Sequence, residues 1–252
     1  MININTHPGF LFYNFLQLLG IYGIYQAEIE KPQPYRLSDK ESIVQRMIPS
    51  KTGMLIIYVP AVVVAVILQM ILPAITSSYA STVPGWMLLA HFIKRCGEVL
   101  YLHKYSGETN LDAARFIGYS YASTTLSISL VSSPSNSSQL GIILFIIGSL
   151  GNLYHHYLLA SLRSGVSLSE KKKYMAPKGG MFEYVATPHY FFELVAWMGI
   201  ALASNQLTAF LNFISMTCYL MARSYNQNQW NMKRFEEKEW PSSRMNMIPF
   251  LF

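Results

Sequence analysis

The chain has 252 residues, of which 52% are hydrophobic and only 13% are charged. Soluble domains carry about 25% charged residues, so this composition disfavours a soluble globular protein and indicates that much of the chain lies in lipid. The net charge of +6 does not require a nucleic-acid partner, because membrane proteins gather Lys and Arg in cytoplasmic loops. The two cysteines both lie in apolar stretches, so neither a disulfide framework nor a zinc site is expected.

Seven apolar stretches follow one another along the chain, each near the length of about 20 residues that a membrane-spanning helix needs. Helices are the expected form, because lipid cannot satisfy exposed backbone groups. The predicted fold is therefore all-α, a single membrane domain over residues 1–252. Its seven transmembrane helices are expected at Gly9–Tyr25, Gly53–Leu72, Pro84–Leu102, Phe116–Val131, Leu140–Ala160, Phe182–Ser204 and Leu207–Ala222.

Positive charge alternates between the segments that connect these stretches. All but two of the nineteen Lys and Arg follow the first, third, fifth or seventh stretch, and none follows the second, fourth or sixth. Because Lys and Arg concentrate on the cytoplasmic side, the alternation predicts a lumenal N-terminus and a cytoplasmic C-terminus. The first stretch lacks the basic flank and cleavage site of a signal peptide, so we interpret it as a retained span.

The third stretch contains five ionisable residues that are costly in lipid: His91, Lys94, Arg95, Glu98 and, at its end, His103. Residues 91, 95 and 98 share one helical face, and Arg95 and Glu98 are spaced to form an ion pair. Such residues within a span indicate a functional site. The alternative is an ion pair that only holds helices together, since buried pairs are frequently structural.

The fifth and sixth stretches repeat this pattern. Asn152, His156 and Arg163 share one face at the end of the fifth, and His189 and Glu193 lie one turn apart in the sixth. A His/Glu pair could bind a metal ion. Because no third ligand stands in an obvious motif, hydrogen bonding is the favoured interpretation and no metal site is predicted.

The predicted topology brings these polar residues from several spans to a pocket that opens to the cytosol. Arg223 lies where the last stretch leaves the membrane on the same side. Arginine binds phosphate oxygens bidentately, so several arginines there favour a phosphorylated ligand. We expect this ligand to be NADPH, which the cytosol supplies.

Several motifs carry a resemblance to a known family. They are Gly151-Asn152, Leu162-Arg163, Tyr174-x-x-Pro177-x-Gly179-Gly180-x-Phe182-Glu183-Tyr184-Val185, Phe235-Glu236 and the final Ile248-Pro249-Phe250-Leu251-Phe252, with His91-Phe92-Ile93-Lys94-Arg95 earlier in the chain. With these motifs the chain resembles the steroid 5α-reductase family. It looks especially like its plant 5α-reductase-like, polyprenol and enoyl-CoA reductase branches.

The resemblance implies a seven-helix fold, NADPH as hydride donor and an α,β-unsaturated carbonyl of a lipid as acceptor. It also implies that residues 151–252 hold the NADPH-binding motifs. The residues expected to bind or support the cofactor are Arg95, His103, Asn152, His156, Arg163, Tyr174, His189, Glu193, Arg223 and Asn231. Asn231 stands where the family usually has a tyrosine, which weakens that one expected contact.

The second stretch departs from the family pattern. The steroid enzymes carry a Gln-Glu or Glu-Ser pair that contacts the substrate ketone, and this chain has Ile57-Tyr58. The Tyr58 hydroxyl can donate a hydrogen bond to a carbonyl oxygen and stabilise the enolate that forms as hydride arrives. We therefore predict Tyr58, His91 and Glu193 as catalytic-site residues. The alternative for Tyr58 is a tyrosine at the membrane interface without a chemical role.

Two other functions fit part of the pattern. Pro188-His189-Tyr190 superficially resembles the His-Pro-x-Tyr motif of integral membrane methyltransferases that use S-adenosylmethionine. A non-catalytic sterol-binding or transport protein would not need the cytosolic arginines. We favour an NADPH-dependent lipid reductase of the endoplasmic reticulum membrane, with a steroid, polyprenoid or enoyl lipid as substrate and no nucleic-acid partner.

Overall fold

The computed structural model describes residues 2–30, 46–105, 107–133, 137–162 and 175–252. Long helices dominate these residues: α1 (Pro8–Glu30), α2 (Ser50–Val66), α4 (Val83–Gly97), α5 (Leu111–Val131), α6 (Gln139–Ser161), α7 (Pro188–Ser204) and α8 (Leu207–Arg234). α2 continues through a π-helical turn, η1 (Ile67–Ile71), into α3 (Leu72–Ile75), and α4 continues into a second π-helical turn, η2 (Glu98–Leu102). Each predicted stretch therefore contains a helix, which confirms a mainly helical fold.

Three of the helices begin at a side-chain cap. The oxygens of Thr82, Asn110 and Ser138 accept hydrogen bonds from the backbone N–H three residues ahead, at the starts of α4, α5 and α6. These caps satisfy backbone donors that have no partner within the helix. Polar residues between the apolar stretches thus decide where the helices start.

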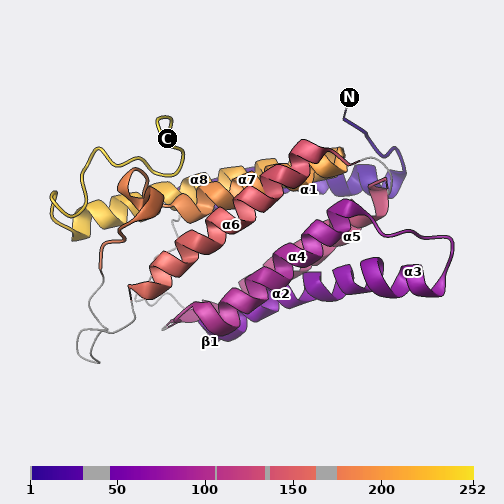
Figure 1. The fold of residues 1–252 in the computed structure, drawn as a ribbon, viewed down its shortest axis with the longest axis horizontal. Coiled ribbons are helices and arrows are strands. Elements are labelled where there is room, and N and C mark those ends of the chain that lie inside the picture. The colour runs from indigo at the N-terminus through magenta and orange to yellow at the C-terminus, as the bar shows by residue number, and fades with distance from the viewer. Residues whose placement is uncertain (1, 31–45, 106, 134–136, 163–174) are drawn as a thin grey trace.

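The helices run roughly side by side along the long axis of the molecule (Figure 1). α2, α4 and α5 form one group, α1, α7 and α8 form another, and α6 packs closely on α7. Glycines permit this last contact: a Cβ on Gly148 would lie 2.3 Å from the backbone nitrogen of Ala196, and one on Gly141 would lie 2.6 Å from that of Ala203. Small residues at such a seam let two helix backbones approach, as in helix pairs within membranes.

The connections alternate between the two ends of the bundle. At one end the N-terminal segment pairs with the α7–α8 turn, where Asn3 N donates to Asn205 O at 3.0 Å. At the other end β1 (Met47–Pro49) pairs antiparallel with β2 (Glu108–Asn110). Val185 and Met245 form a bridge at the end where the C-terminal tail lies. The two termini lie at opposite ends (Figure 1).

The distribution of Lys and Arg differs between the two ends of the bundle. The connecting segments at the N-terminal end, residues 2–7, 76–82 and 205–206, contain no Lys or Arg. Many large apolar side chains point out of the bundle, among them Phe12, Ile75, Phe116 and Leu150. Within the described residues two helices are both long and apolar enough to cross a membrane, Ser50–Ile75 with 26 residues and Gln139–Ser161 with 23. A crossing by all seven helices stays a prediction.

Two boundaries differ most from the predicted ones, while α1 also ends five residues later and α5 begins five residues earlier than expected. The sixth stretch was expected to begin at Phe182, but a short 3-10 helix, η4 (Gly180–Glu183), comes first and α7 begins only at Pro188. The backbone just before α7 pairs with the C-terminal tail instead, since Ala186 N donates to Met245 O at 2.8 Å and Thr187 N donates to Asn246 O at 3.1 Å, and Pro188 then begins the helix. The last helix was expected to end at Ala222, but α8 extends to Arg234 because Asn228 and Asn231 on its polar final turns are buried.

Candidate functional site

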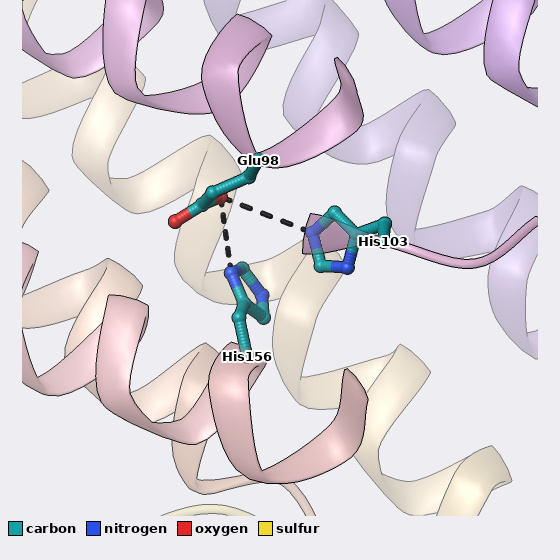
Figure 2. A group of neighbouring side chains, drawn as sticks. All are labelled: Glu98, His103 and His156. Atoms are coloured by element: carbon teal, nitrogen blue, oxygen red, sulfur yellow. Dashed lines mark hydrogen bonds and ion pairs between the residues drawn. The ribbon is translucent and has the colours of Figure 1, made fainter. Parts of the chain in front are cut away.

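Glu98 is the hub of a buried ionic network at the end of α4. Its side chain is only 3% exposed. Its Oε2 atom lies 3.1 Å from His156 Nδ1 and 3.9 Å from His103 Nε2 (Figure 2). Lys94 Nζ lies 3.2 Å from Oε1, and the Arg95 guanidinium donates to Oε2. Two cations therefore contact one carboxylate that is excluded from water.

Arg95 connects this network to α2. Its Nη2 donates to the hydroxyl oxygen of Tyr58 at 2.7 Å, and its guanidinium lies 5.0 Å from the centre of that ring. Tyr58 is buried, so it does not lie at the outer surface of the bundle as an interfacial tyrosine would. Because the Tyr58 oxygen accepts from Arg95, its O–H proton stays available to donate to another oxygen. The chemical role of Tyr58 stays a prediction.

Lys94 extends the network to α6 and α7. Its ammonium group donates to the side-chain oxygen of Asn152, and Asn152 Nδ2 donates to the backbone oxygen of His189 at 2.9 Å. The His189 ring lies 5.4 Å from that of His156, centre to centre. The sequence pointed to Lys94 as a charge within a span but did not predict that it would hold Asn152.

His91 and Glu193 form a second pair beside this network. His91 Nε2 lies 3.3 Å from Glu193 Oε1, which also accepts from Trp197 Nε1 at 3.2 Å. The other polar atoms of the pair, His91 Nδ1 and Glu193 Oε2, are buried without a partner among the described residues. A buried polar atom without a partner costs free energy, so such atoms are candidates for contact with a bound molecule.

An aromatic wall joins the two parts of the site. The Tyr121 ring stacks between Tyr58 and Trp197, with centre-to-centre distances of 6.1 and 6.4 Å. Phe92 packs against all three rings and is fully buried. Neither Tyr121 nor Trp197 was predicted, because an aromatic residue in an apolar stretch gives no signal that separates a site from the core.

Glu98, His103 and His156 present three potential metal ligands whose ligand atoms lie within 4.8 Å of one another (Figure 2). The Arg95 guanidinium occupies this space, because it bonds to Glu98 Oε2 and lies 3.1 Å from His156 Nδ1. The two cations on Glu98 favour an ionic network over a metal centre.

A second polar cluster ties the C-terminal tail to the end of α8. Asn228 accepts from Trp240 Nε1 at 2.8 Å and donates to the backbone oxygen of Arg244 at 2.9 Å. The Arg244 guanidinium stacks on Trp240, 4.0 Å from the centre of its ring. The Nε and Nη1 atoms of Arg244 are buried without a partner among the described residues. Arg244 lines a cavity with Glu183, Tyr184 and Phe250. Nothing in the sequence distinguishes Arg244 as a binding residue from the other cations of the tail.

The remaining predicted cofactor residues are not gathered at Glu98. Asn231 is buried in α8, where its side-chain oxygen accepts from Gln227 at 2.9 Å. Arg223 lies in α8, partly buried. Arg163 and Tyr174 fall outside the described residues. The structure therefore groups Tyr58, Arg95, His103, Asn152, His156 and His189 around Glu98, with His91 and Glu193 adjacent.

Comparison with known proteins identifies the family of this chain. The family model described as 3-oxo-5-alpha-steroid 4-dehydrogenase matches residues 114–252, more than half of the chain. The chain belongs to this family. Mouse 3-oxo-5-alpha-steroid 4-dehydrogenase 1 is 36% identical over 111 residues, which are 44% of this chain and 41% of the mouse protein. Human 3-oxo-5-alpha-steroid 4-dehydrogenase 2 is 35% identical over 114 residues, 45% of this chain and 42% of the human protein.

The resemblance predicted from the motifs is thus confirmed at the level of the family. The chain matches only about two fifths of the length of these curated relatives. The family model covers α6, α7, α8 and most of α5, and so includes Asn152, His156, His189 and Glu193. Tyr58, His91, Arg95 and Glu98 lie before residue 114, outside the match.

Proposed function

We propose that this protein is an NADPH-dependent reductase of a carbon–carbon double bond conjugated to a carbonyl in a lipid. Membership of the 3-oxo-5-alpha-steroid 4-dehydrogenase family supports a reaction of this class. The observation that carries the proposal is the buried bond from Arg95 to Tyr58, because a tyrosine oxygen that accepts from Arg95 keeps its own proton for donation to another oxygen. Such a donor suits a carbonyl oxygen on which negative charge develops.

In this mechanism NADPH, when bound, supplies a hydride to the β-carbon of the substrate. Tyr58 donates a hydrogen bond to the carbonyl oxygen as charge moves onto it. The enolate formed in this way then takes up one proton at its α-carbon, supplied by the solvent, which completes the reduction. Arg95 stabilises the tyrosine oxygen, and Glu98 together with Lys94 holds Arg95 in place. Phe92, Tyr121 and Trp197 exclude water from the reacting atoms, which strengthens these electrostatic interactions.

The residues present fit a dinucleotide of this kind. Glu193 Oε2 is a buried acceptor without a partner in the described part of the chain and suits an amide N–H such as that of a nicotinamide. Arg244 has two buried nitrogen atoms beside a cavity that find no partner in the same residues, and a guanidinium suits phosphate oxygens. We assign the nicotinamide side of the cofactor to Asn152, His189 and Glu193, and a phosphate to Arg244, with Arg163, Tyr174, Arg223 and Asn231 as further contacts.

The direct test measures NADPH oxidation by the protein purified in detergent, with a panel of steroid enones, polyprenals and enoyl thioesters. Oxidation with one substrate class and not the others would support the proposal and name the lipid. Turnover that continues in the presence of a metal chelator would agree with an ionic network, and not a metal centre, around Glu98. Binding of S-adenosylmethionine without any binding of NADPH would instead favour the methyltransferase alternative.

Arg244→Gln should raise the KM for NADPH by about tenfold or more while the KM for the lipid stays within about twofold, because a charge-assisted bond to phosphate is lost. Arg234→Gln is the matched control. The Arg234 guanidinium also lies over a tryptophan ring, 5.0 Å from the centre of Trp230, but Arg234 is exposed at the end of α8. An equal rise of the KM for NADPH in the two variants would contradict a phosphate contact at Arg244.

We further propose seven membrane crossings, with the N-terminus in the lumen of the endoplasmic reticulum and the C-terminus in the cytosol. The absence of Lys and Arg from the segments at the N-terminal end of the bundle supports this orientation. A short extension bearing an Asn-x-Ser/Thr sequon should be glycosylated when it is added before Met1 and remain unmodified when it is added after Phe252. The reverse result would invert the topology.

A further inference from the structure

His155 in α6 is a buried histidine that the proposed mechanism does not use. Its side chain is only 2% exposed, and its ring stacks on that of Phe192 in α7 with 5.1 Å between the two centres. Its Nδ1 lies 2.7 Å from the backbone oxygen of Gly151, one helical turn earlier, and its Nε2 lies 3.1 Å from the backbone nitrogen of Met181. His155 therefore joins α6 to η4, the short helix that precedes α7.

The two backbone contacts fix the tautomer of the His155 ring. A backbone N–H can only donate, so Nε2 accepts from Met181 and carries no proton. A backbone carbonyl can only accept, so Nδ1 carries the proton of the neutral ring and donates it to Gly151. Both nitrogen atoms of this buried ring are satisfied in that state. The bond to η4 therefore requires an acceptor at the position of Nε2.

Gly180 allows the chain to come this close to the ring. A Cβ at that position would lie 2.9 Å from His155 Nε2 and 3.0 Å from a ring carbon of Tyr154, and Gly180 has a φ of 55°, which favours glycine. Gly179 has a φ of 85°, and its N–H donates to Glu183 Oε1 at 2.7 Å. The two glycines thus permit the tight turn into η4, and His155 attaches that turn to α6.

The turn that bonds to His155 leads into the cavity that contains Arg244. Glu183 and Tyr184, two and three positions after the residue that bonds to His155, line this cavity together with Arg244. Met245, the residue after Arg244, donates its backbone N–H to the Tyr184 oxygen at 3.1 Å. A displacement of η4 would therefore move one wall of the cavity and the backbone beside Arg244.

We propose that His155 is a positioning residue for the cofactor. By accepting the Met181 N–H, it holds η4 in the place where the cavity beside Arg244 can receive a phosphate of NADPH. This inference rests on the proposed function, which assigns a phosphate to Arg244. His155 acts through Met181 and not by touching the cofactor. Its loss should weaken NADPH binding more than the hydride step, because the donor to the substrate, Tyr58, is held by Arg95 of α4.

Two substitutions separate the two bonds of the His155 ring. In His155→Gln the amide oxygen reaches the position of Nε2 and can accept from Met181, while the bond to Gly151 is lost. In His155→Asn the amide nitrogen takes the position of Nδ1 and can donate to Gly151, while the bond to Met181 is lost. Each variant loses the aromatic ring and one hydrogen bond, so the two should be destabilised to a similar extent.

We expect the Kd for NADPH to rise about tenfold in His155→Asn, the effect of one buried hydrogen bond left unmade, and to stay within about threefold of the wild type in His155→Gln. The adenosine bisphosphate fragment of NADPH, which lacks the nicotinamide, should show the same ratios, because the change lies at the phosphate. At saturating NADPH, kcat should stay within about threefold of the wild type in both variants. The thermal unfolding midpoint is measured alongside.

The pair of variants separates positioning from packing, because only the bond to Met181 distinguishes them in the direction predicted. Equal Kd values in the two variants, or an unchanged affinity for the bisphosphate fragment in His155→Asn, would overturn the inference and leave His155 as a packing residue. The binding measurements need no enone. If NADPH binds but no enone is reduced, the reductase proposal fails and the Kd values still decide the role of His155. If the wild type binds no NADPH, both proposals fail.

Discussion

Tyr58→Phe should lower kcat by about 100-fold to 1,000-fold and leave the KM for NADPH within about twofold, as expected when one donor to a developing oxyanion is removed. The phenylalanine keeps the ring that packs against Phe92 and Tyr121, so the loss is confined to the hydroxyl that accepts from Arg95. Single-turnover measurement of NADPH oxidation, which separates chemistry from product release, is the appropriate readout.

Tyr121→Phe is the matched control for this change. Tyr121 stacks on Tyr58 and is part of the same wall, but the acceptor for its hydroxyl among the described residues is the weak acceptor Met216 Sδ, at 3.8 Å. We expect its kcat to stay within about threefold of the wild type, since a bond to a thioether contributes little. If the two variants lose turnover equally, or if Tyr58→Phe mainly weakens NADPH binding, Tyr58 is not the hydrogen-bond donor to the substrate.

Glu98→Gln should destabilise the folded protein by about 3–5 kcal/mol, the range observed when one partner of a buried ion pair is removed. The substitution keeps the shape of the side chain but leaves Lys94 and Arg95 buried without the carboxylate that both contact. Because Arg95 also bonds to Tyr58, turnover should fall as well. The stability change is measured by thermal or denaturant-induced unfolding in detergent.

Asp112→Asn is the control for the stability change in Glu98→Gln. Asp112 also forms an ion pair, with Arg115 at 3.6 Å, but its side chain is 74% exposed. An exposed pair contributes about 0–1 kcal/mol, so this variant should unfold almost as the wild type does. Equal stability of the two variants would mean that Glu98 is not the electrostatic centre of the network.

Much of the fold could be predicted from the distribution of apolar and charged residues. A single segment in lipid must satisfy its own backbone groups, which a helix does, so each apolar stretch near spanning length predicted a helix. The positions of Lys and Arg anticipated which connections share an end of the bundle, and the pairing of Asn3 with Asn205 agrees with that division. The start of α7 was missed, because residues 182–187 continue the apolar stretch, and their backbone pairing with Met245 and Asn246 of the distant tail leaves no mark in the local sequence.

The candidate site was predictable in its residue types and only partly in its contacts. Ionisable residues within apolar stretches stand out because burying them is costly, which identified Arg95, Glu98 and His156. Helical spacing shows which residues share a face, but it does not show which other helix that face meets. The bonds from Lys94 to Asn152 and from Arg95 to Tyr58 depend on how α4 is rotated against α6 and α2.

The sequence by itself therefore determined the helical class, the division of charge between the two ends and the family, since each depends on local composition or on motifs read along the chain. Only the tertiary structure decided that Glu98 is the hub, that Tyr58 is buried on Arg95, and that His91 pairs with Glu193 of another helix. These features arise where helices distant in sequence meet. For example, the glycines of α6 allow its backbone to approach that of α7 closely. Which residues then come into contact depends on the distance and rotation between the two helices, and the pattern along one helix does not give these.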